Sequence, residues 1–207
     1  MFNKKGFELS ATFIVTLIIV IIVFVGSIYF IKEFFYKAEE LKAEIERSTQ
    51  EQIESLLQQG SLVALPINMK EVDIGESKTF GLGVRNIGDM KGFNLVVSFN
   101  KAIDSLGEVI VDESYREYIN SNWLLYDMNG FYLDSNELKV LPIAVRPGFN
   151  IAEGEAVVPG TYLFNVCVFV DSGAVDPNLC TLDAFKFSTD KSEYYTKKMY
   201  SLMVEVK

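Results

Sequence analysis

Hydrophobic positions follow two different patterns along this chain, one before residue 61 and one after it. From Leu9 to Ile31 there are 23 consecutive uncharged residues, dominated by Ile, Val, Leu and Phe. At about 1.5 Å per residue they would form a helix of roughly 35 Å, longer than the hydrocarbon core of a bilayer at about 30 Å. The run therefore predicts a membrane-spanning helix, with a buried core helix as the alternative.

The polar segment that follows continues the helical pattern. Residues 32–60 consist mostly of strong helix formers, and no glycine or proline occurs between Gly26 and Gly60. Apolar residues recur there at three- and four-residue steps: Phe34, Ala38, Leu41, Ile45, Ile53 and Leu56. This stripe predicts packing on the following domain or on neighbouring copies, with a solvated spacer as the alternative. Gly60 is the expected end of the helix.

After residue 61 the pattern changes to short segments rich in β-branched and aromatic residues, separated by turn signals. In "TYLFNVCVFV" (residues 161–170) apolar residues fill both the alternating positions and most of those between, which predicts a central strand. Asn129-Gly130 lies between "WLLYDM" and "FYLD" and predicts a tight hairpin. About eight strands are expected, which suits a two-sheet sandwich.

Charge and cysteine content narrow the classes of function. The formal net charge is −9, and residues 61–207 contain 20 acidic against 13 basic side chains, which argues against nucleic acid as a partner. Cys167 and Cys180 are 13 positions apart. A disulfide between them would imply a compartment outside the cytosol, while two free buried thiols are the alternative.

No arrangement of residues predicts catalysis. The chain has no histidine, so Ser-His-Asp and Cys-His arrangements and the commonest metal ligand are missing. Asp127, Asn129, Asp134 and Glu137 lie close in sequence, but Gly130 follows too early for a helix-loop-helix calcium site. We therefore expect no enzymatic activity, no catalytic or metal-binding residues and no cofactor.

An aromatic-rich stretch in the third zone has two interpretations. It contains Trp123 together with Tyr115, Tyr118 and Tyr126. We interpret these residues as sandwich core with an insertion above it, and an exposed recognition surface is the alternative.

Two stretches of the third zone resemble the immunoglobulin-like modules of archaeal and bacterial surface proteins. "IGESKTFGLGVRNIGD" is similar to their Gly-Glu, strand and Asn-x-Gly turn. "LKVLPIAVRPGFNIAEGEAVVPGTYLFNVCVFV" is similar to their strand, loop, Pro-Gly-Thr-Tyr and strand. The resemblance implies a structural or interaction unit.

The N-terminus, "KKGFELSATFIVTLIIVIIVF", resembles the class III signal peptide of archaeal type IV pilin-like proteins. The resemblance implies that Lys4 and Lys5 are recognised by a leader peptidase, that Gly6 is the last residue removed and that Phe7 begins the mature chain. It also implies that the helix anchors the protein or packs in a filament. The residues expected to do so are Glu8, Leu9, Phe13, Leu17, Ile21, Phe24 and Ile28.

The combined prediction is an α+β fold with one long N-terminal helix followed by an all-β, immunoglobulin-like sandwich. Its segments are a basic leader at 1–6, a transmembrane or assembly helix at 7–31, an amphipathic stalk at 32–60 and the sandwich at 61–207. The expected function is that of a non-enzymatic, pilin-like structural protein of the cell surface. The alternative is a single-pass anchored protein whose head binds another envelope component.

The expected partners follow from the same interpretation. They are the membrane, other copies through the N-terminal helix and another cell-envelope protein, with no nucleic acid. The N-terminus is expected in the cytoplasm and the C-terminal domain outside the cell, because Lys4 and Lys5 precede the apolar run.

Overall fold

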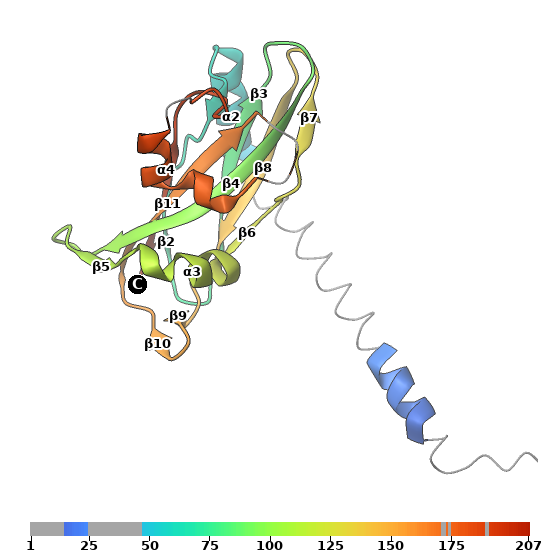
Figure 1. The fold of residues 1–207 in the computed structure, drawn as a ribbon, viewed down its shortest axis with the longest axis vertical. Coiled ribbons are helices and arrows are strands. Elements are labelled where there is room, and N and C mark those ends of the chain that lie inside the picture. The colour runs from blue at the N-terminus through green and yellow to red at the C-terminus, as the bar shows by residue number, and fades with distance from the viewer. Residues whose placement is uncertain (1–14, 25–46, 171–172, 174, 189–190) are drawn as a thin grey trace, which may run out of the picture. The chain divides into compact units, whose positions relative to one another are not determined.

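The strands of this protein form two main sheets in its C-terminal unit (Figure 1). The computed structural model describes residues 15–24, 47–170, 173, 175–188 and 191–207. The chain divides into two units, residues 1–43 and residues 44–207. In the first unit, residues 15–24 form a helix. All other elements belong to the second unit.

The first sheet contains four strands and the second contains six, and two further strands form a small sheet of their own. The first sheet has the order β1 (Val63–Ala64), β3 (Lys78–Arg85), β8 (Leu138–Val145) and β6 (Leu124–Tyr126). The second has the order β2 (Met69–Val72), β12 (Tyr200–Val206), β11 (Gly160–Phe169), β4 (Lys91–Ile103) and β5 (Val109–Val111). β7 (Phe131–Leu133) pairs with the start of β4, and β9 (Asn150–Ala152) pairs with β10 (Glu155–Ala156). Within these pairs β2 and β12 are parallel, whereas the other pairs are antiparallel.

The main core lies between the two sheets, because alternate side chains of a strand point to the same face. Along β11, Tyr162, Phe164 and Val166 are fully buried in this core. On the opposite face of β11, Cys167 and Phe169 are also buried, in a second small cluster. β11 lies between β4 and β12, so the prediction of a central strand with two apolar faces is confirmed.

The predicted hairpin at Asn129-Gly130 is wrong, because the two flanking strands join different partners. β6 pairs with β8, whereas β7 pairs with β4. The side-chain amide of Asn86 fixes β7 by donating to the carbonyl oxygen of Leu133 at 3.0 Å and to that of Asp89 at 2.7 Å. Burial of each strand against its own partner therefore outweighs the local turn signal.

Helix α2 (Arg47–Gln58) packs on the outer face of the first sheet. Ile53 and Leu57 are fully buried there, and a Cβ on Gly83 of β3 would lie only 2.2 Å from Cγ2 of Ile53. Arg85 donates from Nη1 to the carbonyl oxygen of Leu57 at 2.9 Å, which places a cation at the negative end of the helix. Gly60 follows with a φ of +108°, so the predicted helix end is confirmed.

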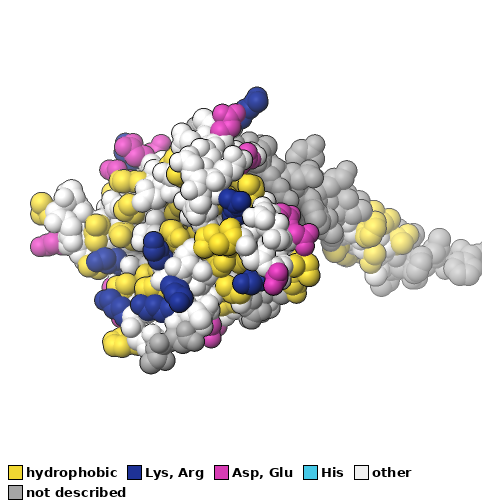
Figure 2. All heavy atoms as spheres, turned by 90° about the horizontal axis from the view of Figure 1, so that it is seen from above, with side chains coloured by type: hydrophobic (Ala, Val, Ile, Leu, Met, Phe, Trp, Pro, Cys, Tyr) yellow, Lys and Arg dark blue, Asp and Glu magenta, His cyan; other side chains and the backbone are white. Residues whose placement is uncertain are grey.

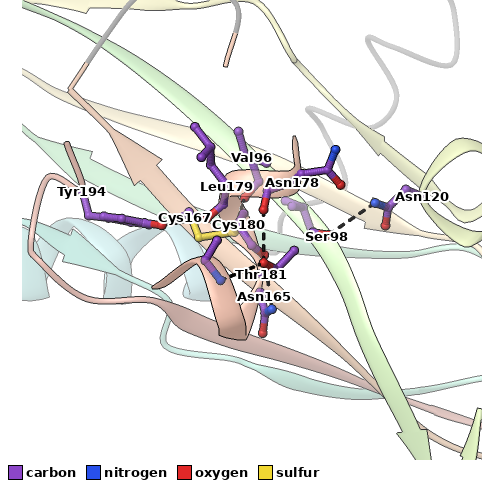
Figure 3. Close-up of a disulfide and its surroundings, with 12 residues drawn as sticks. Val96, Ser98, Asn120, Asn165, Cys167, Asn178, Leu179, Cys180, Thr181 and Tyr194 are labelled. Atoms are coloured by element: carbon purple, nitrogen blue, oxygen red, sulfur yellow. Dashed lines mark hydrogen bonds between the residues drawn. A yellow bond between two sulfur atoms is a disulfide. The ribbon is translucent and has the colours of Figure 1, made fainter. Parts of the chain in front are cut away.

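The segment between β11 and β12 covers the outer face of the second sheet. It contains η2 (Pro177–Cys180) and α4 (Leu182–Phe187), and a disulfide joins Cys180 to Cys167 of β11 (Figure 3). The side-chain amide of Asn165 donates to the carbonyl oxygen of Cys180 at 3.2 Å, and the hydroxyl of Tyr194 donates to that of Leu179 at 2.7 Å. Helix η2 is therefore fixed by covalent and hydrogen bonds.

Helix α3 (Arg116–Trp123) follows the short helix η1 (Glu113–Tyr115) and covers one edge of β4. Between its pairings with β7 and β5, this edge has no neighbouring strand in the described part of the chain. Side chains bond its backbone instead. The N–H of Phe99 donates to Oδ1 of Asn120 at 2.7 Å, and Nε of Arg116 donates to the carbonyl oxygen of Phe99 at 2.9 Å. The N–H of Val97 donates to the hydroxyl of Tyr126 at 3.2 Å.

The predicted long N-terminal helix is wrong. The described fold is mostly β, with four short helices, and the helix near the N-terminus covers residues 15–24. No helix among the described residues has the length and apolar character to cross a bilayer. Propensity and hydrophobicity favour a helix but do not fix where it begins and ends.

The identification of the chain, by resemblance, as an archaeal type IV pilin-like protein with an immunoglobulin-like head is wrong for the same reason. It required a continuous helix of about fifty residues ahead of the head, and the described residues contain no long helix. The descriptions that depended on this helix, as a transmembrane, filament-forming or pilin-like protein, are withdrawn with it.

Gly83→Ala should separate α2 from β3. A methyl group would overlap Ile53, and overpacking of this kind costs about 1–3 kcal/mol of the free energy of unfolding, which chemical denaturation measures. Gly88→Ala is the matched control, since its Cβ would meet only the mobile end of the Lys91 side chain at 3.4 Å. Equal stability of the two variants would contradict the close approach.

Removing the disulfide should destabilise the protein. The bond closes a loop with a sequence separation of 13, for which about 3 kcal/mol is expected. The double variant Cys167→Ala and Cys180→Ala should lose about that much in a denaturant titration. Hydrogen exchange should rise first in η2 and α4. Reduced wild-type protein provides the control, and an unchanged stability in both samples would refute the role of the bond.

Candidate functional site

The residues predicted to anchor or assemble the protein do not form a described site. Leu17, Ile21 and Phe24 lie in the helix at 15–24, where their side chains are exposed. The remaining predicted residues lie outside the described ranges: Lys4, Lys5, Gly6, Phe7, Glu8, Leu9, Phe13 and Ile28. The structure does bring Cys167 and Cys180 together.

The acidic turn residues considered as calcium ligands bond their own loops. Asp127 accepts from the N–H of Asn129 at 3.0 Å and from its side-chain amide at 2.9 Å. Glu137 accepts from the N–H of Asp134 at 2.7 Å. Across the residues that the structure describes, no three His, Cys, Asp or Glu side chains are grouped so as to hold a metal ion.

The aromatic stretch divides between the core and the surface. Trp123 is buried, and its ring centroid lies 4.9 Å from that of Tyr162. Tyr115 and Tyr126 are partly buried against the main core. Tyr118 lines a groove beside α3 instead. The interpretation as core therefore holds for Trp123 and does not describe Tyr118.

This groove beside α3 is the candidate site. It has a volume of about 350 Å³ and lies between α3, the turn before β3 and the loop from β8 to β9. Among its lining residues are Tyr118, Asn122, Trp123, Arg146, Gly148 and Phe149. Aromatic side chains beside a few polar groups are typical of binding sites.

Two other hollows have similar volumes but present less to a ligand. One of about 500 Å³ is lined by the polar face of α2 with Pro66. Another of about 480 Å³ is lined by Lys197, Lys198 and two tyrosines, whose hydroxyls are engaged within the protein. Tyr195 donates to the carbonyl oxygen of Arg85 at 2.6 Å, and Tyr200 donates to Oγ1 of Thr196 at 3.0 Å. We therefore place the candidate site at the groove beside α3.

Hydrogen bonds hold the walls of the groove together. The indole N–H of Trp123 donates to the carbonyl oxygen of Asn150 at 3.1 Å, and the N–H of Arg146 donates to that of Trp123 at 2.8 Å. The N–H of Gly75 donates to the carbonyl oxygen of Pro147 at 2.8 Å. The floor is tight, since a Cβ on Gly148 would lie 3.2 Å from the indole nitrogen. The loop is therefore preorganised.

Phe149 is the most exposed aromatic side chain of the groove, at 75%. Its backbone is nevertheless fixed, because its carbonyl oxygen accepts from the N–H of Val157 at 2.9 Å. The ring lies beside Gly75, whose Cβ position would be 3.8 Å from Cζ of Phe149. The φ of Gly75 is +84°, a conformation that glycine adopts without strain.

Arg146 supplies the charge of the groove. Its Nε donates to the carbonyl oxygen of Gly75 at 2.9 Å, which orients the guanidinium group. None of the carboxylates in the described ranges forms an ion pair with it. No other charged side chain lines the groove. The site therefore combines an oriented cation with an exposed aromatic ring.

The acidic excess of the chain does not produce an acidic patch on the face shown in Figure 2. Asp and Glu side chains are scattered on this face, while some Lys and Arg side chains gather beside hydrophobic ones. The overall charge therefore does not by itself identify a binding surface on this face.

Sequence analysis missed Arg146 and Phe149, because they lie in a stretch that was interpreted only as the loop of an immunoglobulin-like module. The available signal was a large aromatic residue directly after a turn dipeptide, where polar residues are usual. Their arrangement also depends on Gly75 and Trp123, which are distant in sequence.

Comparison with known proteins gives no family for this chain. No protein-family model matches it. No curated protein matches it either. Solved structures with some similarity include an ASH/PapD-like domain of human CEP192, with a TM-score of 0.34 and 12% identity over 70% of this chain and 84% of that one.

Other similar structures belong to unrelated kinds of protein. The Pseudomonas fluorescens alkylpurine DNA glycosylase AlkC has a TM-score of 0.38 and 11% identity over 74% of this chain and 33% of that one. The class 5 fimbriae chaperone CfaA has a TM-score of 0.34 and 11% identity over 69% and 54%, respectively. Similarities this low carry no argument about this protein.

Tyr162 should make the protein less stable at alkaline pH. Burial raises the pKa of its phenol to about 12, partly offset by the N–H of Val158, which donates to the phenol oxygen at 3.4 Å. In the unfolded chain the pKa is about 10, so the stabilisation is complete below pH 10 and is lost as the pH rises towards 12. Denaturant titrations across this range should show a falling free energy of unfolding.

The variant Tyr162→Phe tests the assignment. Without the phenol hydroxyl, the free energy of unfolding should fall less steeply with pH. The slope should decrease by the contribution of about one proton released on unfolding. The ultraviolet absorbance of phenolate, followed in both proteins, separates ionisation from unfolding. An identical pH dependence in the variant would show that another group controls alkaline stability.

Proposed function

We propose that this chain is a non-enzymatic binding protein of the cell envelope, whose two-sheet head binds another envelope protein through the groove beside α3. The observation that carries the proposal is Phe149, which is 75% exposed on a loop held by hydrogen bonds and lies next to Arg146. The exposed Phe149 ring leaves apolar surface in contact with water. A partner that covers the ring would bury this surface, which stabilises the complex.

The composition of the groove supports protein binding. Tyr and Arg are among the residues most enriched where binding energy is concentrated, and the groove presents Tyr118 and Arg146 above the buried Trp123. The hydrogen bonds from Trp123 and Arg146 fix the loop before any partner arrives. A preorganised loop loses little conformational entropy on binding, which favours affinity.

The same composition favours binding over catalysis. The residues that line the groove include no carboxylate, histidine or cysteine, which are the usual acids, bases and nucleophiles of enzymes. Its one cation is suited to attract an anionic group.

The disulfide supports a location outside the reducing cytosol. Bonds such as that between Cys167 and Cys180 persist in oxidising compartments and are rare in the cytosol. The proposed partner is therefore another protein of the envelope or the cell surface. The acidic balance of the chain disfavours nucleic acid in this role.

A photoreactive amino acid at position 149 of the full chain should trap the partner in living cells. The same group at Leu106, which is 84% exposed on the loop between β4 and β5, is the matched control. We expect one defined adduct from position 149 and none from position 106. Excess unlabelled wild-type chain should suppress the adduct, because it competes for the same partner.

Excess Phe149→Ala chain should suppress the adduct far less. Truncation of a residue central to binding costs about 2 kcal/mol or more, which corresponds to about thirtyfold in affinity. Equal suppression by both chains, or no adduct from position 149, would refute the proposed binding site.

A further inference from the structure

The residues of the groove indicate the chemistry of its ligand. Resting on the proposed function, we infer that the groove recognises an acidic peptide segment of its partner, in which a carboxylate lies next to an apolar side chain. Three observations lead to this assignment: the bonding of Arg146, the charge around it and the position of Phe149.

The guanidinium group of Arg146 has two ends, and only one is engaged. Nε donates to the carbonyl oxygen of Gly75 at 2.9 Å, which fixes the plane of the group. Among the described residues no acceptor bonds the two terminal nitrogens. This pair of nitrogens matches the two oxygens of a carboxylate, which arginine binds through parallel hydrogen bonds.

Charge around the groove favours an anion there. The head is acidic as a whole, with 20 acidic against 13 basic side chains in residues 61–207. The groove reverses this balance, because Arg146 is the single charged residue among those that line it. The local charge of the groove therefore favours an acidic segment over a neutral or basic one.

Phe149 defines the second half of the ligand. Its ring lies beside Gly75, the residue whose carbonyl oxygen also orients Arg146. Cation and ring are therefore held by the same turn. When Arg146 binds a carboxylate of an extended peptide, the side chain two positions along the peptide lies on the same face and is the one that meets this ring. An aliphatic or aromatic side chain there would bury apolar surface, which a second charge would not.

Two matched peptide libraries test the inference on the full chain. One has a fixed Glu with Phe, Leu or Tyr two positions after it, and the other has Gln in place of Glu, with random uncharged residues at the remaining positions. We expect the Glu library to bind at least about tenfold more tightly, because a hydrogen-bonded charge is worth about a factor of ten or more. Arg146→Gln should remove this preference, and Arg146→Lys should restore only part of it.

The control variant is Arg47→Gln, which removes the same charge from α2, where the arginine side chain is 94% exposed. It should leave the preference for Glu unchanged, and thermal melts should show that all variants are folded. Equal binding of the two libraries, or a preference that survives Arg146→Gln, would overturn the carboxylate assignment. The carboxylate assignment would also be overturned if neither library binds while position 149 still yields its adduct. The groove would then bind a partner through a different kind of ligand. Loss of that adduct alone would refute the proposed function.

Discussion

The pairing between β4 and β11 is the contact on which the rest of this protein depends. Nine residue pairs join the two strands, from Thr161 with Ile103 to Phe169 with Asn94. One face of the pair supplies much of the main core, and the opposite face carries the disulfide and the segment around it. Any loss of this register would move alternate side chains to the wrong face, and both clusters would be lost together.

Helix α3 connects this central pair to the groove. Arg116 and Asn120, one helical turn apart, bond the edge of β4, whereas Tyr118 and Asn122 lie about half a turn away and line the groove. The same eight-residue helix thus closes an open strand edge, which would otherwise invite pairing with another chain, and supplies one wall of the site. The position of the groove is therefore fixed by the hydrogen bonds that hold this helix against the edge of β4.

Sequence alone predicted the parts of this fold that depend on local periodicity. The apolar run of β11 indicated a central strand, and Gly60 marked the end of a helix. It failed in two places: it predicted a long N-terminal helix that the described residues do not contain, and Asn129-Gly130 did not reveal that its flanking strands join different partners. The groove was beyond sequence patterns because Arg146 is oriented by a residue 71 positions away.

Residues 83–86 show how many parts of a fold can depend on a few neighbours. Gly83 admits α2, Arg85 bonds the end of that helix and accepts from Tyr195, and Asn86 holds β7. The roles of Gly83, of the Arg85 guanidinium group and of the Asn86 amide are steric or depend on side-chain hydrogen bonds, so other side chains cannot replace them readily. Evolutionary drift should therefore erase most of the surface before it changes the pattern Gly-x-Arg-Asn. That short stretch offers a physically grounded key for recognising remote relatives whose overall similarity has faded.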